Sequence, residues 1–376
     1  MKHLLSVLLI ALVLAGCAQK QTVEIKLPNK DQNVNIGKPI EVDNNIGKPI
    51  EEIVESIDEI EIVENEMPII DNSESMKIAF TYPSKMVAKY ARTSMNTILA
   101  YLAYKKINYQ IKVFDSLTES SENLAGTINK IKEAGYTNVI ALYTPNALNS
   151  LSTIDTSGLK MYFPIINKNS AVEINNNYIF GAISYDKQIT KLLEYSNTKN
   201  TMFYQESFLG SKLKAKYEAQ ATDIVVSKVI KKKRNYFKGL VRDNRLRNST
   251  LFLNTSIVKS SILLSQLRAY SIYPKVILST QLNYNPKLLS LTQVKDRSNF
   301  VIANSIDTVD GKLEDMVSNY GGDIKYNWVD YSTLVGISYL YDDNDSEVVS
   351  VEIEDNQVNY EPKLFKSTAF GFLEIK

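Results

Sequence analysis

The chain has 376 residues, with 43 Lys and Arg against 42 Asp and Glu and a formal net charge of +1 at pH 7. This length allows two domains with separate cores, and the near-zero charge gives no overall field that would attract nucleic acid. The one Cys and the one His are Cys17 and His3, so residues 18–376 contain neither thiol nor imidazole. Catalytic Ser-His-Asp and Cys-His sites and His or thiolate zinc sites are therefore excluded there. Carboxylate pairs and lysine chemistry remain open, but no spacing indicates them, so we expect no enzyme, no metal site and no cofactor.

The N-terminus is typical of an exported protein. A short basic start precedes an apolar run over residues 4–14 that is too short to cross a bilayer, which indicates a signal peptide over residues 1–16. The run ends in Leu-Ala-Gly-Cys at Cys17, which resembles the bacterial lipobox. By that resemblance Cys17 would carry acyl chains such as palmitate, anchoring a periplasmic protein to the membrane. Ala18 after the Cys favours the outer membrane by analogy, and the alternative is an ordinary secretory signal with a chance Cys.

Residues 17–75 lack amphipathic periodicity and are predicted to be a flexible acidic tether. A ten-residue repeat places Asn-Ile-Gly-Lys-Pro-Ile-Glu at residues 35–41 and again at 45–51, and its Gly and Pro disfavour helices and central strands. Residues 51–66, called the acidic segment below, hold eight acidic residues and no basic one. Self-repulsion should keep this segment extended. It is interpreted as a spacer, with a docking motif for a basic partner as the alternative.

From residue 76 onward, strands alternate with helices. An apolar run over residues 77–82 is followed by a helix predicted over 84–106, whose residues Val87, Ala91, Met95, Ile98 and Leu102 form one apolar stripe. A strand over 110–114, a helix over 120–134 that Gly135 ends, and strands over 138–143, 160–166 and 178–181 follow. Ser120 and Ser121 are candidate N-caps of the second helix. This order predicts a parallel sheet of βαβ units.

A second series follows the first. Its predicted strands are residues 201–204, 223–229, 251–253, 275–278 and 300–303, and its predicted helices are 185–196, 209–221 and 258–269. A helix over 329–341 and a hairpin about Asp355 and Asn356 come last. We expect an α/β fold of two lobes, each a mostly parallel sheet flanked by helices. The first lobe takes residues 76–183 and a return segment over 305–345, and the second takes 184–304 and the C-terminal hairpin.

Several stretches resemble the type I periplasmic binding protein fold. They are the opening strand with its long helix, the strand from Met161 to Asn167, and residues 263–268 with the strand that follows into Thr280 and Gln281. The resemblance covers residues 76–376. It implies one of two relatives: a solute-binding lipoprotein, or an LppC/LpoA-type activator of penicillin-binding proteins, which is the peptidoglycan synthase class.

Ligands of open parallel sheets bind beyond the carboxyl ends of the strands. The polar residues predicted there as an interlobe cleft are Tyr82, Ser84, Tyr143, Thr144, Gln205, Gln281 and Tyr284. Amino-acid-binding members of the resembled family carry Gly-rich and Ser/Thr-rich loops whose amides cradle a carboxylate. Gly is scarce at these positions here, which counts against an amino-acid site. Packing between lobes is the plainer interpretation of each tyrosine.

Residues 228–247 hold nine basic side chains against Asp243 alone. The predicted partner-binding patch within this basic run is Lys231, Lys232, Lys233, Arg234, Arg242 and Arg245. Because an exported protein rarely meets nucleic acid, anionic glycan, lipid headgroups or an acidic protein face are the candidate ligands. A solvated loop is the plainer interpretation.

The hypothesis drawn from the sequence is a non-catalytic envelope lipoprotein that binds a protein partner and regulates peptidoglycan synthesis. That partner would be a periplasmic or inner-membrane protein of the peptidoglycan synthase kind. The alternative is a lipoprotein that captures a small, amino-acid-like solute for an ABC transporter.

Overall fold

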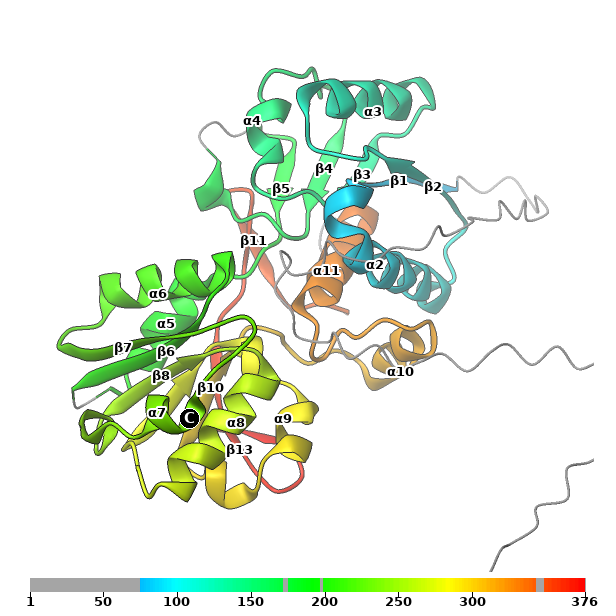
Figure 1. Cartoon of the computed structure of the whole chain (residues 1–376). Helices are drawn as coiled ribbons and strands as arrows, with labels where there is room; N and C mark the ends of the chain where they lie inside the picture. Colours follow the sequence, from blue (N-terminus) through cyan, green and yellow to red (C-terminus); the bar gives the residue numbers. More distant parts are fainter. Residues whose placement is uncertain (1–74, 172–174, 197–198, 343–347, 376) are drawn as a thin grey trace, which may run out of the picture. The chain divides into compact units, whose positions relative to one another are not determined.

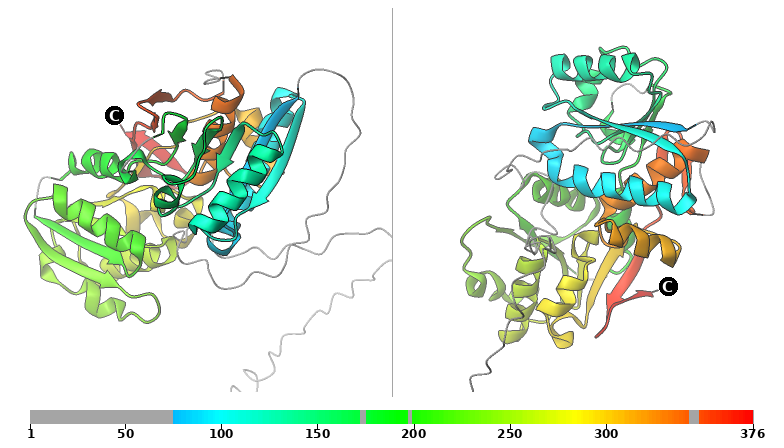
Figure 2. Two further views of the ribbon diagram at one scale, coloured as in Figure 1. Left: turned by 90° about the horizontal axis from the view of Figure 1, so that it is seen from above. Right: turned by 90° about the vertical axis from the view of Figure 1, so that its right-hand side faces the viewer.

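The computed structural model describes residues 75–171, 175–196, 199–342 and 348–375. The predicted signal peptide, Cys17 and the tether lie outside these residues. Within the described ranges the chain forms two seven-stranded sheets, each mostly parallel and each covered by helices on both faces (Figure 1 and Figure 2). The predicted α/β fold of two lobes is confirmed.

The first sheet has the strand order β11-β12-β5-β4-β3-β1-β2. Its strands are β1 (Met76–Tyr82), β2 (Tyr109–Asp115), β3 (Asn138–Ala141), β4 (Lys160–Phe163), β5 (Tyr178–Phe180), β11 (Glu352–Glu354) and β12 (Gln357–Asn359). All neighbouring pairs are parallel except β11 with β12. The carboxyl ends of β1, β2 and β3 therefore lie side by side at one edge, called the first rim below.

Helices on the two faces of this sheet bury its two cores. The helices of the first lobe are α2 (Ser84–Lys105), α3 (Ser121–Glu133), α4 (Ala147–Leu151), α10 (Gly311–Asn319) and α11 (Trp328–Asp342). The core on one face includes side chains of α2, α10 and α11, and the core on the other includes those of α3 and α4. Figure 1 shows α2 and α11 on one side of the strands and α3 and α4 on the other. The apolar stripe predicted for α2 faces the core, with Val87, Ala91, Ile98 and Leu102 buried.

Local signals set the ends of α3 as the sequence predicts. The Asn123 N–H donates to Ser120 Oγ over 3.4 Å, which caps the start of the helix. Gly135 follows the helix with a φ of 73°, a left-handed conformation that Gly adopts at little cost.

The second sheet has the order β14-β13-β10-β9-β8-β6-β7. Its strands are β6 (Asn200–Gln205), β7 (Ile224–Ile230), β8 (Thr250–Asn254), β9 (Val276–Ser279), β10 (Phe300–Asn304), β13 (Lys363–Ser367) and β14 (Phe372–Ile375). Its helices are α5 (Tyr185–Leu193), α6 (Phe208–Gln220), α7 (Phe237–Val241), α8 (Ile257–Ala269) and α9 (Pro286–Leu291). Strand β7 is an edge strand that pairs with β6. The carboxyl ends of β6, β8 and β9 form the second rim.

The C-terminal strands differ from the prediction. The hairpin about Asp355 and Asn356 forms, and both residues have the positive φ that a tight hairpin turn requires. It extends the first sheet through β12 and β5, however, not the second. A further hairpin that was not predicted, β13 with β14, extends the second sheet antiparallel to β10.

Candidate functional site

The first rim is organised by an acidic side chain at the end of β2. Helix α2 begins after Pro83, which provides no side-chain cap. The Asp115 carboxylate supplies one instead: its Oδ1 accepts the Ser84 N–H at 3.0 Å and the Leu117 N–H at 2.7 Å. A carboxylate is favoured at this position because backbone N–H groups at a helix N-terminus have no partner within the helix.

A second carboxylate closes the rim beside β3. Glu119 is 9% exposed, and its two carboxylate oxygens accept the Thr144 N–H at 2.5 Å and the Thr144 hydroxyl at 2.6 Å. Burial raises the pKa of the Glu119 carboxyl above its ordinary value, and the two bonds from Thr144 partly offset that rise. The Ser150 hydroxyl donates to the Glu119 backbone carbonyl at 3.1 Å and fixes the turn.

The predicted cleft residues of the first rim have different environments. Ser84 and Thr144 give their N–H groups to Asp115 and Glu119 as described above. Tyr143 is fully buried, and its hydroxyl is hydrogen-bonded to Thr81 Oγ1 at 2.7 Å. Burial raises the pKa of Tyr143 to about 12, so this side chain is a neutral core residue. Tyr82 is half-buried, with its ring 5.7 Å from that of Phe80.

The predicted residues of the second rim also bond internally. Gln281 is 7% exposed, and its Oε1 accepts the Gln188 amide at 2.6 Å and the Ser305 N–H at 3.2 Å. The Gln205 Oε1 accepts the Ser256 N–H at 2.9 Å. The ring of Tyr284 packs among aromatic rings, including those of Phe365 and Phe372.

A small cavity lies at the second rim. Its volume is about 10 Å³, and it is lined by Gln205, Ser207, Leu209, Gly210, Asn254, Thr255, Ser256 and Leu282. The amide nitrogen of Asn254 is buried without a hydrogen-bond partner among the described residues. A cavity of this size holds about one water molecule, which is too small for an amino acid.

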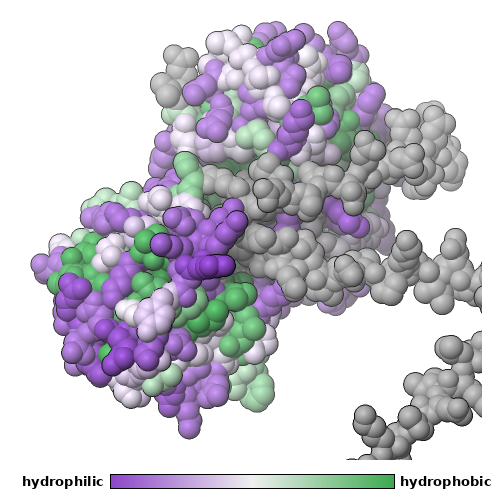
Figure 3. All heavy atoms as spheres, viewed as in Figure 1, coloured by the Kyte–Doolittle hydropathy of each residue, from purple (hydrophilic) through white to green (hydrophobic). Residues whose placement is uncertain are grey.

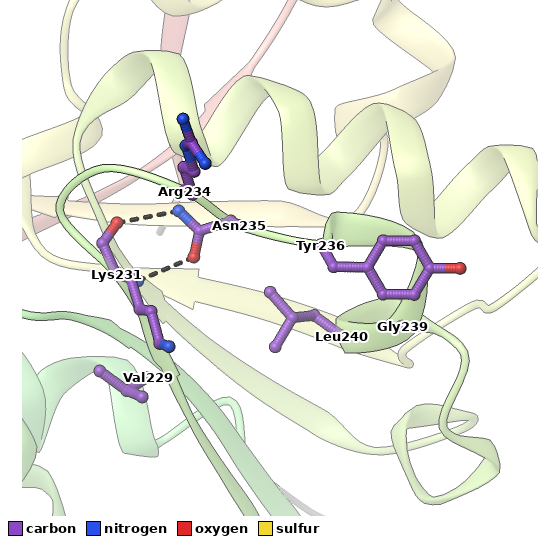
Figure 4. Close-up of a pocket in the computed structure, with 7 residues that line it drawn as sticks. All are labelled: Val229, Lys231, Arg234, Asn235, Tyr236, Gly239 and Leu240. Carbon is purple, nitrogen blue, oxygen red and sulfur yellow. Dashed lines mark hydrogen bonds between the residues drawn. The ribbon is translucent and has the colours of Figure 1, made fainter.

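A larger pocket lies in the predicted basic run, beside the loop that joins β7 to α7. We call residues 231–236 the basic loop. The pocket has a volume of about 570 Å³ and is lined by Val229, Lys231, Arg234, Asn235, Tyr236, Gly239 and Leu240 (Figure 4). Tyr236 is 71% exposed and Val229 is 37% exposed, so apolar surface meets water next to the basic side chains.

The loop is shaped by its own asparagine. The side chain of Asn235 accepts the Lys231 N–H and donates to the Lys231 carbonyl, both at 2.8 Å (Figure 4). The Lys232 N–H donates to the carboxylate of Glu206 at 3.0 Å. Arg234 projects to the opposite side of the loop from Leu240 (Figure 4).

The basic run divides into charges that are paired and charges that are not. Asp243 forms ion pairs with Lys228 at 3.0 Å and with Arg245 at 2.9 Å, which holds the pKa of its carboxyl well below the ordinary value. Arg242 lies over the ring of Tyr270 at 5.7 Å. By contrast, the four consecutive basic side chains of the basic loop form no ion pair with a carboxylate of the described residues, and all four are exposed: Lys231, Lys232, Lys233 and Arg234. Lys238, Arg242 and Arg247 also form no ion pair with these residues, but Lys238 and Arg242 lie over the ring of Tyr270 and Arg247 donates to the Ser271 carbonyl. Figure 3 shows strongly hydrophilic side chains gathered over the end of β7 and this loop.

Two features of the described ranges concern metal binding and the membrane. No cluster of three or more His, Cys, Asp or Glu suited to a metal ion occurs among these residues. No helix in the same part of the chain combines the length and the apolar character that a membrane crossing requires.

Comparisons with known proteins identify the fold. No family model matches the chain, and no curated protein sequence matches it either. Among solved structures, a candidate branched-chain amino acid ABC transporter protein of Rhodospirillum rubrum is similar, with a TM-score of 0.62 at 11% identity, over 80% of this chain and 100% of that one. LivJ of Streptococcus pneumoniae, a branched-chain amino acid substrate-binding protein in complex with isoleucine, has a TM-score of 0.54 at 10% identity, over 80% and 100%. The C-domain of Haemophilus influenzae LpoA, a regulator of PBP1A, has a TM-score of 0.53 at 12% identity, over 80% and 100%.

These likenesses show the fold of the described residues. The two lobes have the type I periplasmic binding protein fold, as the sequence resemblance predicted. The same fold serves solute-binding proteins and LpoA regulators, so the fold itself does not choose between them.

The sequence did not reveal the roles of Asp115 and Glu119. A weak signal existed for Asp115, because it directly ends a predicted strand at a sheet edge and precedes a small polar residue. Nothing local marks Glu119, whose partner Thr144 is 25 residues away and meets it only in the folded chain.

Proposed function

We propose that the protein is a non-catalytic envelope lipoprotein that binds a protein partner and regulates peptidoglycan synthesis. The observation that carries this proposal is that the chain's own carboxylates occupy the donors of the first rim. Glu119 takes both the N–H and the hydroxyl of Thr144, and Asp115 takes the N–H of Ser84. Solute binding would need such donors to be free.

The physical argument concerns what a ligand carboxylate would meet at this rim. In amino-acid-binding relatives, backbone amides of these loops cradle the carboxylate, and they can do so only while unpaired. The carboxylate of a ligand would have to displace the Glu119 carboxylate from Thr144. The two negative charges would then lie beside each other, and that of Glu119 is buried. Like charges a few ångströms apart in a buried site disfavour each other strongly. The first rim is therefore suited to stability and poorly suited to binding an anionic solute.

Cellular location is part of the proposal. The lipobox-like Leu-Ala-Gly-Cys at Cys17 and the long acidic tether support a periplasmic body held to a membrane, here the outer membrane, by an acyl anchor. The similarity to the C-domain of LpoA supports a regulatory role toward a peptidoglycan synthase.

The surface proposed for the partner is the pocket beside the basic loop. The exposed apolar surface of Val229 and Tyr236 lies there beside Lys231 and Arg234, which line the pocket. Lys232 and Lys233 are exposed in the same loop, and none of the four basic side chains has an ion-pair partner among the described residues. Aromatic and basic residues side by side are typical of protein interfaces, and basic charge at the edge steers acidic partners. An acidic protein face with apolar residues fits this chemistry.

The test is photo-crosslinking in cells from a photoreactive residue placed at Lys233. The proposal predicts a discrete adduct that contains a peptidoglycan synthase. The adduct should be lost when Lys232 and Arg234 are reversed to Glu, and it should be kept when the exposed Lys275 and Lys366 of the same lobe are reversed. An adduct with an ABC transporter subunit, or none with a cell-wall synthase, would refute it.

A second candidate is capture of a small, amino-acid-like solute for an ABC transporter. The observation in its favour is the TM-score of 0.62 to the Rhodospirillum rubrum protein, whose whole length is matched. In this case the first rim would have to release Glu119 on binding. Direct, saturable binding of an amino acid to the purified protein would establish it.

A further inference from the structure

We propose that the chain's own acidic segment, residues 51–66, binds the basic loop and covers the pocket beside it. This contact does not depend on the identity of any partner, because both elements belong to the same chain. The pocket is then occupied by a segment of the same chain, and the basic loop is covered by it.

The first step is the chemistry of the pocket. Lys231, Lys232, Lys233 and Arg234 place four positive charges in consecutive positions, and Asp243 nearby is already held by Lys228 and Arg245. Glu206 is the carboxylate that contacts the loop, and it bonds the Lys232 backbone N–H. The loop therefore carries excess positive charge beside exposed apolar surface.

The second step is the chemistry of the occupant. The eight acidic residues of the acidic segment are Glu51, Glu52, Glu55, Asp58, Glu59, Glu61, Glu64 and Glu66, and no basic residue lies between Lys48 and Lys77. Six aliphatic residues are interleaved with them, namely Ile53, Val54, Ile57, Ile60, Ile62 and Val63. The segment thus matches the pocket in both respects, with negative charge for the basic loop and aliphatic side chains for Val229 and Tyr236.

The acidic segment must also be able to reach the basic loop. The acidic segment ends ten residues before Met76, the first residue of β1, and begins twenty-five residues before it. An extended chain spans up to about 3.3–3.6 Å per residue, so residue 51 can lie roughly 80 Å from Met76. A folded chain of about 300 residues has a radius of gyration of about 19 Å, so this length suffices to reach any part of the body.

The strength of the contact depends on its being intramolecular. Ion pairs on a surface are individually weak, and the same segment added as a free peptide would bind poorly. Covalent attachment changes this, because a flexible linker gives an effective concentration on the order of millimolar. A contact with a dissociation constant on the order of millimolar would then be about half occupied. A partner must compete with this occupant, and the competition weakens as salt screens the charges.

The experiment measures the distance between the two elements in the full chain with no partner present. Cys17→Ser removes the chain's one thiol, and Ser56→Cys with Ser227→Cys then places one spin label in the acidic segment and one on the exposed face of β7. Pulsed dipolar spectroscopy at low ionic strength should show a short, narrow distance population. In about 1 M salt, where the Debye length falls to about 3 Å, that population should be replaced by a broad one.

Two sets of variants assign the contact. Reversal of Lys232, Lys233 and Arg234 to Glu should abolish the short population, whereas reversal of the exposed Lys275, Lys295 and Lys366 should preserve it. Neutralising the segment by Glu55→Gln, Asp58→Asn, Glu59→Gln and Glu61→Gln should also abolish it, and all four changes lie outside the described residues.

Three results would overturn the inference. One is a broad distribution at low salt, and another is a short population that survives either the loop reversal or the neutralisation of the segment. The third is a short distance that appears when two singly labelled chains are mixed, because it would show that the contact joins two copies.

Discussion

The first rim and the basic loop differ in how their charged side chains are paired. At the first rim, Asp115 and Glu119 are surrounded by donors from their own lobe, and Glu119 is almost fully buried. At the basic loop, four positive side chains extend into solvent without a carboxylate partner among the described residues. At the first rim the chain's own carboxylates accept the N–H groups of Ser84, Leu117 and Thr144, whereas the basic loop presents exposed positive charge without a carboxylate partner among the described residues. We interpret the first as structural and the second as available for binding.

The largest expected effect concerns a buried carboxyl near the start of α11. Asp330 is fully buried, its Oδ2 accepts the Asp323 N–H at 2.9 Å, and burial raises its pKa from 3.8 to about 7. A raised pKa means that the folded state holds the proton more tightly than the unfolded state. The stability contribution is thus fully present below about pH 4 and is lost as the pH rises through about 7.

At about 1.4 kcal/mol per pKa unit, this site alone accounts for a loss of up to about 4 kcal/mol between those limits. Asp330→Asn should flatten the pH profile of the unfolding free energy, measured by urea denaturation. The exposed Asp315→Asn on α10 should leave the profile unchanged. An equally steep profile in Asp330→Asn would show that another group is responsible.

Next in size is the removal of Glu119. Glu119→Ala leaves the Thr144 N–H and hydroxyl without their acceptor in a buried setting, which costs about 1–3 kcal/mol in unfolding free energy. Glu133→Ala, an exposed change on α3, should alter stability by less than about 0.5 kcal/mol. Because the vacated site has the size and donors for a carboxylate, acetate should raise the melting temperature of Glu119→Ala and not that of the wild type. Equal effects of acetate on both proteins would contradict our account of the first rim.

The first lobe shows which features can be predicted from the sequence and which cannot. The stripe of α2, the cap at Ser120 and the end at Gly135 were predicted because each depends on residues within a few positions. The bonds of Glu119 to Thr144 and the burial of Tyr143 depend on how strands meet, and no local pattern carries that information. Helix α10 was not predicted, although the Asp310 carboxylate caps its start by accepting the Lys312 and Leu313 N–H groups.

A smaller effect is expected from the side chain that shapes the basic loop. Asn235→Ala removes the two hydrogen bonds to Lys231, and because the site is partly solvated the loss should be about 1 kcal/mol or less. Amide hydrogen exchange should accelerate in the basic loop and remain unchanged in the strands. Asn319→Ala, an exposed change at the end of α10, serves as the control, and protection of the loop that is unaltered in Asn235→Ala would exclude this role.

The smallest stability effect should come from the charges of the basic loop. Reversal of Lys232, Lys233 and Arg234 to Glu should change the unfolding free energy by less than about 0.5 kcal/mol, because these side chains form no ion pair within the described residues. A large loss of stability on thermal unfolding would mean that the loop charges are structural, and the contrast with the first rim would fail.

We propose that the chain's own carboxylates close the first rim to amino-acid solutes. The most direct measurement is a thermal-shift titration of the wild-type protein with each of the twenty amino acids. A ligand at about 100 times its dissociation constant stabilises the folded state by about 2.7 kcal/mol, which would be readily visible as a rise in melting temperature. We predict no rise with any of them. A saturable rise with one amino acid, lost in Thr144→Val, would contradict the claim and establish the protein as a solute-binding protein.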